Sequence, residues 1–239
     1  MLPEQSSRNL LGTCHAPQAS AAPPLSWGRD PEQQPTRDER PDRLVDCEMT
    51  GLSLAADALI EVAALVTDFE LNQLGEGIDL VIKPPAEALD QMDEFVRNMH
   101  TSSGLLEELA AGITMAEAEE QVLAYVREWV PDAAKAPLGG NTVGTDRAFL
   151  ARDMPELESH LHYRIIDVSS IKELSRRWFP RAYFNSPTKA GGHRALADIR
   201  ESIAELRYYR EAVFVVPPGP DSEAAKAIAA RHVIGPPTA

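Results

Sequence analysis

The stretch "VDCEMTGL", residues 45–52, places two acids inside a short apolar strand. Asp46 and Glu48 are two positions apart, so in a strand both side chains point to the same face. Two carboxylates that converge where water is scarce repel each other strongly. The pair is consistent either with two surface acids at a solvated strand end or with a site for a hard cation such as Mg²⁺ or Mn²⁺.

The residues around this stretch predict an α/β fold. Apolar and β-branched runs predict five strands, and a short turn near Asn72 and Gly75 predicts a hairpin between the second and the third. The first strand starts at Leu44, so it looks short. The expected strands cover residues 44–49, 59–72, 77–82, 136–141 and 163–168.

Apolar residues at helical spacing predict five helices that follow or alternate with these strands. Leu196, Ile199, Ile203 and Leu206 are expected on the inner face of the last one. Three strands followed by alternating helices and strands indicate a mixed five-stranded sheet with helices on both faces. The expected helices cover residues 88–100, 114–130, 145–154, 169–179 and 193–214, with capping boxes at Thr114/Glu117 and Ser170/Glu173.

The two ends of the chain differ in composition from this ordered region. Residues 1–41 contain seven of the nineteen prolines and almost no apolar periodicity, which is typical of a disordered extension. Residues 217–239 form a Pro-rich tail with one short helical stretch. We therefore predict one domain over residues 42–216 between two tails.

Charge and cysteine content limit the functions of the protein. With 23 Lys and Arg against 37 Asp and Glu, the net charge of −14 argues against binding to long DNA or RNA, which depends on basic side chains. The two cysteines, Cys14 and Cys47, do not form a disulfide framework. No apolar run approaches the ~20 residues of a membrane span. These features predict a cytoplasmic protein that does not associate with membranes.

Further acids and one histidine lie at predicted strand ends and helix starts. Asp146 follows a strand and begins a helix, where the helix dipole alone would favour an acid. His193 opens the last helix, and Asp198 lies just over one turn later. Alone, Asp198 is explained by pairing with Arg194 or Ser202 on the helix surface. Only their order along one α/β chain suggests a common site.

That order resembles the DEDDh class of 3′→5′ exonucleases, which have a ribonuclease-H-like fold. The segments "DCEMTGL", "LIEVAALVTD", "HYRIIDVSSIKEL" and "HRALADIRESIAELRYYR" resemble the oligoribonuclease family in its actinobacterial form. The resemblance extends from about Leu44 to Phe214. It implies that two Mg²⁺ or Mn²⁺ ions bind to Asp46, Glu48, Asp146 and Asp198, and that His193 is the general base.

The same resemblance implies roles in substrate binding. Leu52 and Phe95 match positions that sandwich the bases, although packing in the core of its helix explains Phe95 equally well. Three residues match positions that cap the 5′ phosphate, and Asn141 precedes the first of them. Tyr163 matches a residue that acts in the active site of the other subunit of a homodimer. The expected phosphate cap is Thr142, Arg164 and Ser169.

The leading hypothesis is therefore an exoribonuclease that cuts very short oligoribonucleotides, such as the dinucleotide pGpG, to mononucleotides. A second hypothesis is an exonuclease that trims longer strands, which would need a basic groove. A third is a non-catalytic module that binds nucleotides or a partner. The presence of His193 and all four acids speaks against the third.

Overall fold

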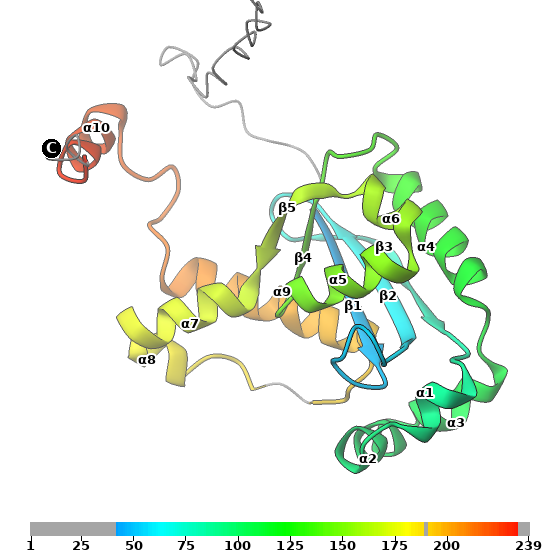
Figure 1. Ribbon diagram of the computed structural model, residues 1–239. Helices are drawn as coiled ribbons and strands as arrows, with labels where there is room; N and C mark the ends of the chain where they lie inside the picture. Colours follow the sequence, from blue (N-terminus) through cyan, green and yellow to red (C-terminus); the bar gives the residue numbers. More distant parts are fainter. Residues whose placement is uncertain (1–41, 189–190, 234–239) are drawn as a thin grey trace, which may run out of the picture. The chain divides into compact units, whose positions relative to one another are not determined.

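A mixed five-stranded sheet is the centre of the protein in the computed structural model, which describes residues 42–188 and 191–233 (Figure 1). The strand order is β3-β2-β1-β4-β5. β1 pairs antiparallel with β2, and β2 with β3, whereas β4 runs parallel to both β1 and β5. The strands are β1 (Asp42–Met49), β2 (Leu59–Thr67), β3 (Gln73–Val81), β4 (Pro137–Gly140) and β5 (His162–Asp167).

Helices cover both faces of this sheet, as predicted (Figure 1). Side chains of α4 and α5 pack with β1, β2 and β4 in the largest apolar cluster. On the other face, α9 packs on β2 through Ile199 and Ile203. The helices are α1 (Ala86–Asp90), α2 (Glu94–Ser102), α3 (Leu105–Glu108), the 3₁₀ turn η1 (Leu109–Ala111), α4 (Met115–Trp129), α5 (Gly144–Asp153), α6 (Pro155–His160), α7 (Val168–Trp178), α8 (Pro180–Phe184), α9 (Ala195–Ala212) and α10 (Ser222–Ala230).

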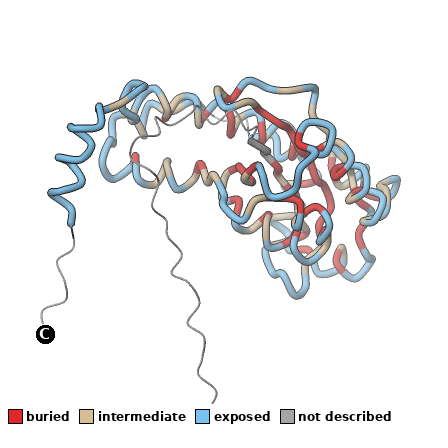
Figure 2. The backbone as a smooth tube through the Cα atoms, turned by 90° about the horizontal axis from the view of Figure 1, so that it is seen from above, coloured by how far each residue is buried: buried red, intermediate tan, exposed pale blue. Residues whose placement is uncertain are grey.

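β2 is the most deeply buried element of the sheet. All nine of its residues are buried, and they include the acid Glu61. β2 lies between β3 and β1, with helices on both faces of the sheet, and this explains its burial. Figure 2 shows the buried residues of the protein in red. The buried core therefore extends from β2 to β1, the strand that carries the first two acids.

Several predicted boundaries are wrong in detail. The hairpin between β2 and β3 is present, but β2 ends at Thr67 and β3 begins at Gln73, so Gly75 lies within β3 and not in the turn. β1 begins at Asp42, two residues before the predicted start, so it has eight residues and is not short. The predicted helix 88–100 is two helices, because the Asp93 side chain accepts a bond from the Val96 N–H and starts α2. The N-cap of α7 is Asp167 rather than Ser170, which instead donates its N–H to Asp167. The last helix begins at Ala195, after His193.

Other local predictions are correct. The capping box of α4 has both of its bonds, from Thr114 to Glu117 and back. The short helix expected in the C-terminal tail is α10. The predicted extension over residues 1–41 lies outside the residues that the structure describes. Within the described ranges, no helix is long and apolar enough to cross a membrane.

Candidate active site

β1 carries core residues on one face and acids on the other. Val45 and Cys47 belong to the largest apolar cluster. Asp46 pairs with Ala63 of β2, which packs with residues of α9 on the opposite face of the sheet. Because side chains alternate along a strand, Glu48 shares the face of Asp46. The alternation thus directs both acids of "VDCEMTGL" toward the start of α9.

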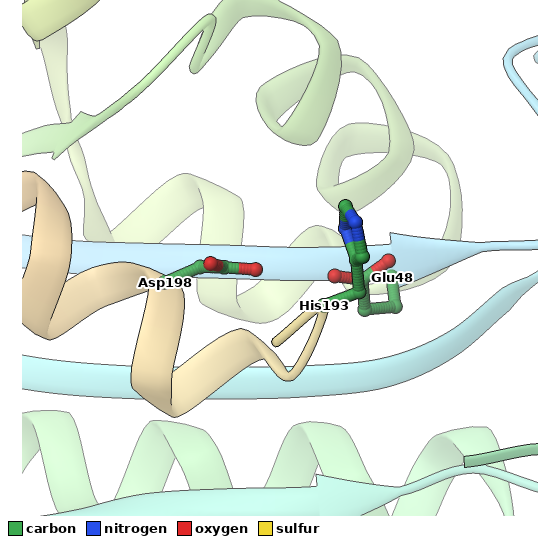
Figure 3. A group of neighbouring side chains, drawn as sticks. All are labelled: Glu48, His193 and Asp198. Atoms are coloured by element: carbon green, nitrogen blue, oxygen red, sulfur yellow. The ribbon is translucent and has the colours of Figure 1, made fainter. Parts of the chain in front are cut away.

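Glu48, His193 and Asp198 lie together at the end of β1 (Figure 3). One potential ligand atom of each residue lies within 4.8 Å of those of the other two. Glu48 is buried, Asp198 is partly buried and His193 is exposed. The group therefore connects the protein interior with solvent, as a site that admits a water molecule and a substrate must.

Asp146, in the first turn of α5, is close enough to act on the charge of Glu48 but is not part of the group of three. Its Oδ1 accepts a hydrogen bond from the Cys47 N–H at 3.1 Å, so it lies against the peptide between Asp46 and Glu48. Burial raises the pKa of Asp146 to about 6, although hydrogen bonds from its own N–H and that of Cys47 oppose the rise. The buried surroundings of Asp146 thus disfavour its ionised form.

The pKa of the Cys47 thiol reflects three nearby acids. Its pKa is raised well above the ordinary value, first by burial and then by the charges of Asp146, Asp46 and Glu48. Glu48 is affected in the same way. Burial, followed by the charges of Asp198, Glu61 and Asp146, raises its pKa to about 8, and only Arg194 opposes this.

This donor set fits divalent cations. Carboxylate oxygens are the preferred ligands of hard cations, and an imidazole suits the transition metals among them. A bound cation would offset the repulsion that, together with burial, raises the pKa of Glu48. Glu48 and Asp198 lie close enough to share one ion. Asp46 is on the same face of β1 as Glu48, and Asp146 of α5 binds the N–H of Cys47 between them.

His193 is held by the chain in an uncommon conformation. Its φ of 47° lies in the left-handed region, which is unusual for a residue with a Cβ atom. The following residue, Arg194, forms an ion pair with Glu61 at 2.7 Å. Sequence analysis missed Glu61, although a single acid inside the apolar run "LIEVAALVT" was a signal.

The predicted phosphate cap is partly assembled around Asn141. The Asn141 side chain accepts a bond from Ser169 Oγ at 3.1 Å and donates to Ser202 at 2.7 Å. Thr142 Oγ1 lies 3.1 Å from Ser169 Oγ. Thr142, with a φ of 55°, also donates its N–H to Asp167 at 2.9 Å. Loop, helix α7 and helix α9 are thereby fastened together beside the acids.

Arg164 and Tyr163 lie elsewhere, on the edge strand β5. The Tyr163 side chain is 66% exposed, and its hydroxyl accepts a bond from Arg164 Nε at 3.1 Å. Within one chain these two residues bind each other on an outer strand. The third member of the predicted cap is thus not assembled with Thr142 and Ser169.

Leu52 and Phe95 are two of the most exposed large apolar side chains, at 80% and 79%. The explanation of Phe95 as a core residue is therefore wrong. Leu52 follows β1, and Phe95 is in the first turn of α2. His100 of α2, which is buried, bonds the Met49 carbonyl through Nε2 at 2.9 Å and fixes α2 to the end of β1.

Comparison with known proteins identifies the family. The exonuclease family model called RNase_T matches residues 44–206. Oligoribonuclease of Streptomyces avermitilis is 74% identical over 81% of this chain and 98% of its own length. Oligoribonuclease of Cutibacterium acnes is 64% identical over 79% of this chain and 93% of its own. The chain belongs to the oligoribonuclease family.

Membership of the oligoribonuclease family confirms the leading prediction: the protein is a hydrolytic 3′→5′ exoribonuclease that acts on short oligonucleotides. It also favours that prediction over a trimming exonuclease and over a non-catalytic module. The family of the sequence resemblance and its actinobacterial character are both confirmed.

Solved exonuclease structures confirm the fold. Exonuclease I from Methylocaldum szegediense aligns with a TM-score of 0.52 and 22% identity, over 73% of this chain and 41% of that one. Exonuclease I of E. coli, solved with a 5cy-dT13 oligonucleotide, aligns with a TM-score of 0.56 and 20% identity, over 73% and 41%. This chain thus spans about two fifths of those exonucleases, and the likeness concerns the ribonuclease-H-like fold.

Proposed function

We propose that this oligoribonuclease-family protein hydrolyses dinucleotides such as pGpG to mononucleotides in the cytoplasm, with two divalent cations and His193 as general base. The observation that carries the proposal is the convergence of Glu48, His193 and Asp198 beside Asp46 and Asp146. The pKa of Glu48, raised to about 8 mainly by burial and then by other acids, marks a site that favours bound cations.

The four carboxylates hold the cations, Mg²⁺ or Mn²⁺. Asp46, Glu48, Asp146 and Asp198 together supply about four negative charges, which two divalent ions balance. When bound, such ions lower the pKa of a water molecule and stabilise the departing 3′ oxygen. The protein contributes the fixed position of each carboxylate, from β1, from the first turn of α5 and from the first turn of α9.

His193 takes a proton from the attacking water at one of its ring nitrogens. It is exposed and lies beside Glu48 and Asp198, so it can reach both solvent and the reacting group (Figure 3). An imidazole has an ordinary pKa near neutrality, which suits a group that must accept and then release a proton.

The remaining predicted residues bind the substrate. Leu52 and Phe95 present apolar side chains to solvent, and aromatic and aliphatic faces of this kind stack on bases. Thr142 and Ser169 offer hydroxyl groups to a terminal phosphate. A dinucleotide needs no long basic groove, in agreement with the net charge of −14.

Arg164 binds the 5′ phosphate together with Thr142 and Ser169. Tyr163 acts in a homodimer, in which Tyr163 of one subunit completes the active site of the other. The support is an exposed apolar surface on β5, α7 and α8, since single domains rarely leave so many large side chains in water. β5 is an edge strand, so it can approach a second copy. The exposed side chains are Tyr163, Ile165, Leu174, Trp178 and Phe184.

One assay tests the reaction. Purified protein is incubated with a 5′-labelled RNA dinucleotide in Mn²⁺ or in EDTA, and with a labelled strand of about twenty nucleotides. We expect rapid release of mononucleotide from the dinucleotide in Mn²⁺, little from the long strand, and none in EDTA. Equal turnover of both substrates, or turnover in EDTA, would contradict the proposal.

A mixing experiment tests the dimer. Tyr163→Ala keeps its acids but lacks the tyrosine, and Asp146→Asn keeps its tyrosine but binds cations poorly. Each variant alone should be inactive, whereas co-refolded mixtures contain dimers with one complete site, so activity should return. Mixed dimers that form but stay inactive would show that Tyr163 does not act across subunits.

A further inference from the structure

We infer that Glu61, Arg194 and Glu108 are positioning residues that hold His193 and Asp198 in place at the start of α9. We call these three residues the α9 clamp. None of them is one of the four proposed metal-binding acids or a proposed substrate-binding residue. The Arg194 side chain binds the carboxylates of both Glu61 and Glu108. The inference rests on the proposed role of His193.

Glu61 is the inner end of the α9 clamp. It lies directly opposite Glu48 in the β1–β2 ladder, and its side chain is fully buried. Glu61 Oε1 accepts from Arg194 Nε at 2.7 Å, and Oε2 accepts from the Ala195 N–H at 2.9 Å. Both carboxylate oxygens are thus bound to the two residues that follow His193.

The contact with Ala195 supplies a cap that α9 lacks in its own sequence. The first N–H groups of a helix have no partner within the helix, and a side chain at the N-cap position usually binds one of them. The N-cap residue of α9 is Arg194, whose side chain has no acceptor and makes no such bond. Glu61 of β2 binds the first N–H instead and joins α9 to an interior strand of the sheet.

Glu108 is the outer end of the α9 clamp. Arg194 Nη1 and Nη2 donate to its two oxygens at 3.0 and 2.9 Å. The planar guanidinium therefore bridges a buried acid of β2 and a partly exposed acid of α3, with 28% of the Arg194 side chain accessible to solvent. Forked pairs of this kind fix orientation as well as distance.

These contacts determine where His193 can lie. It has a left-handed backbone with a φ of 47°, a conformation that persists only where neighbouring contacts impose it. The adjoining residue is fixed by three side-chain bonds, and Asp198 follows one turn into the helix. Loss of the α9 clamp would let His193 move relative to Glu48 without removing any ligand or base.

The experiment compares Glu61→Gln, Arg194→Gln, the double variant, and Glu108→Gln as a milder change at the outer end. Arg210→Gln is the matched control, because Arg210 also joins α9 to an acid, Glu70, but near the other end of the helix. For each protein kcat and KM for the dinucleotide, the melting temperature, and the NMR signals of the His193 ring are measured well below melting.

We expect Glu61→Gln and Arg194→Gln each to lower kcat by roughly tenfold to a hundredfold, the scale of a small misplacement of a catalytic group, with KM unchanged. The double variant should be no slower than the slower single variant, because the two residues act as a unit. The His193 signals should shift in all clamp variants, and Arg210→Gln should resemble the wild type.

Folded Glu61→Gln and Arg194→Gln with wild-type kcat and unshifted His193 signals would overturn the inference, as would losses that multiply in the double variant. If Glu61→Gln does not fold, the His193 signals of Glu108→Gln are used instead: shifted signals support the inference and unshifted signals contradict it. His193→Ala tests the general-base role of His193 separately from its positioning by the α9 clamp. If that variant keeps its rate, the general-base role fails, whereas the His193 signals in the clamp variants still test the positioning.

Discussion

Replacement of Glu48 by glutamine should inactivate the protein and stabilise it in the absence of metal. The pKa of Glu48 is raised from 4.5 to about 8, first by burial and then by Asp198, Glu61 and Asp146. Between these two pH values the folded protein keeps a proton that the unfolded chain has released. The free energy of unfolding therefore decreases as pH rises through this window.

The magnitude follows from the width of the window. At pH 7 the unfolded glutamate is ionised while the folded one is mostly protonated, and the difference corresponds to ~3 kcal/mol. Glutamine has a similar shape and does not ionise. The free energy of unfolding of Glu48→Gln at pH 7 should therefore exceed that of the wild type by up to ~3 kcal/mol. Near pH 4 Glu48 is mostly protonated in both the folded and the unfolded state. The difference in stability between Glu48→Gln and the wild type should then nearly vanish.

Urea unfolding in EDTA at pH 4 and pH 7 measures this difference, and Glu120→Gln, at an exposed site on α4, is the control. Added Mn²⁺ should raise the stability of the wild type more than that of Glu48→Gln, because a ligand that binds only the folded state stabilises it. Equal stability of Glu48→Gln and the wild type at pH 7, or a gain that is the same at both pH values, would refute the reasoning.

Three further predictions concern the proposed roles. His193→Ala should bind Mn²⁺ and dinucleotide normally but hydrolyse ~10²–10⁴ times more slowly; weaker substrate binding at an unchanged rate would instead make His193 a binding residue. Asp198→Asn should be inactive and show weaker Mn²⁺ binding by isothermal titration, and unchanged affinity with full activity would remove it from the site. Deletion of residues 1–41 should change neither melting temperature nor turnover, because that stretch lacks a core-forming pattern; a large decrease in either would show that it packs on the domain.

Periodicity and order along the chain were sufficient to predict much of this protein. The strand alternation predicted that Asp46 and Glu48 share a face, and the spacing of α9 predicted that Ile199 and Ile203 pack inward. Two of the boundary errors, at α2 and α7, have the same cause. Side chains of Asp93 and Asp167 cap helices that the apolar pattern alone placed elsewhere.

The α9 clamp could not be predicted from the sequence, because its three members are far apart along the chain. Glu61 contacts Arg194 across 133 positions, and Glu108 contacts it across 86. Helical spacing suggested that Arg194 pairs with Asp198, whereas its side chain turns to the sheet and to α3. The rule for neighbouring residues on a helix failed here, because an unpaired buried carboxylate costs more free energy than an ion pair on a helix surface gains.

The Cys47 thiol, buried and surrounded by carboxylates, has a consequence for redox chemistry. Peroxides and disulfides react with the thiolate, and burial together with the charges of Asp146, Asp46 and Glu48 raises the pKa of this thiol well above its ordinary value. The cysteine beside the proposed metal-binding acids is thus poor in the reactive form. Oxidants that modify enzymes with exposed low-pKa cysteines should therefore leave the Cys47 thiol largely unmodified.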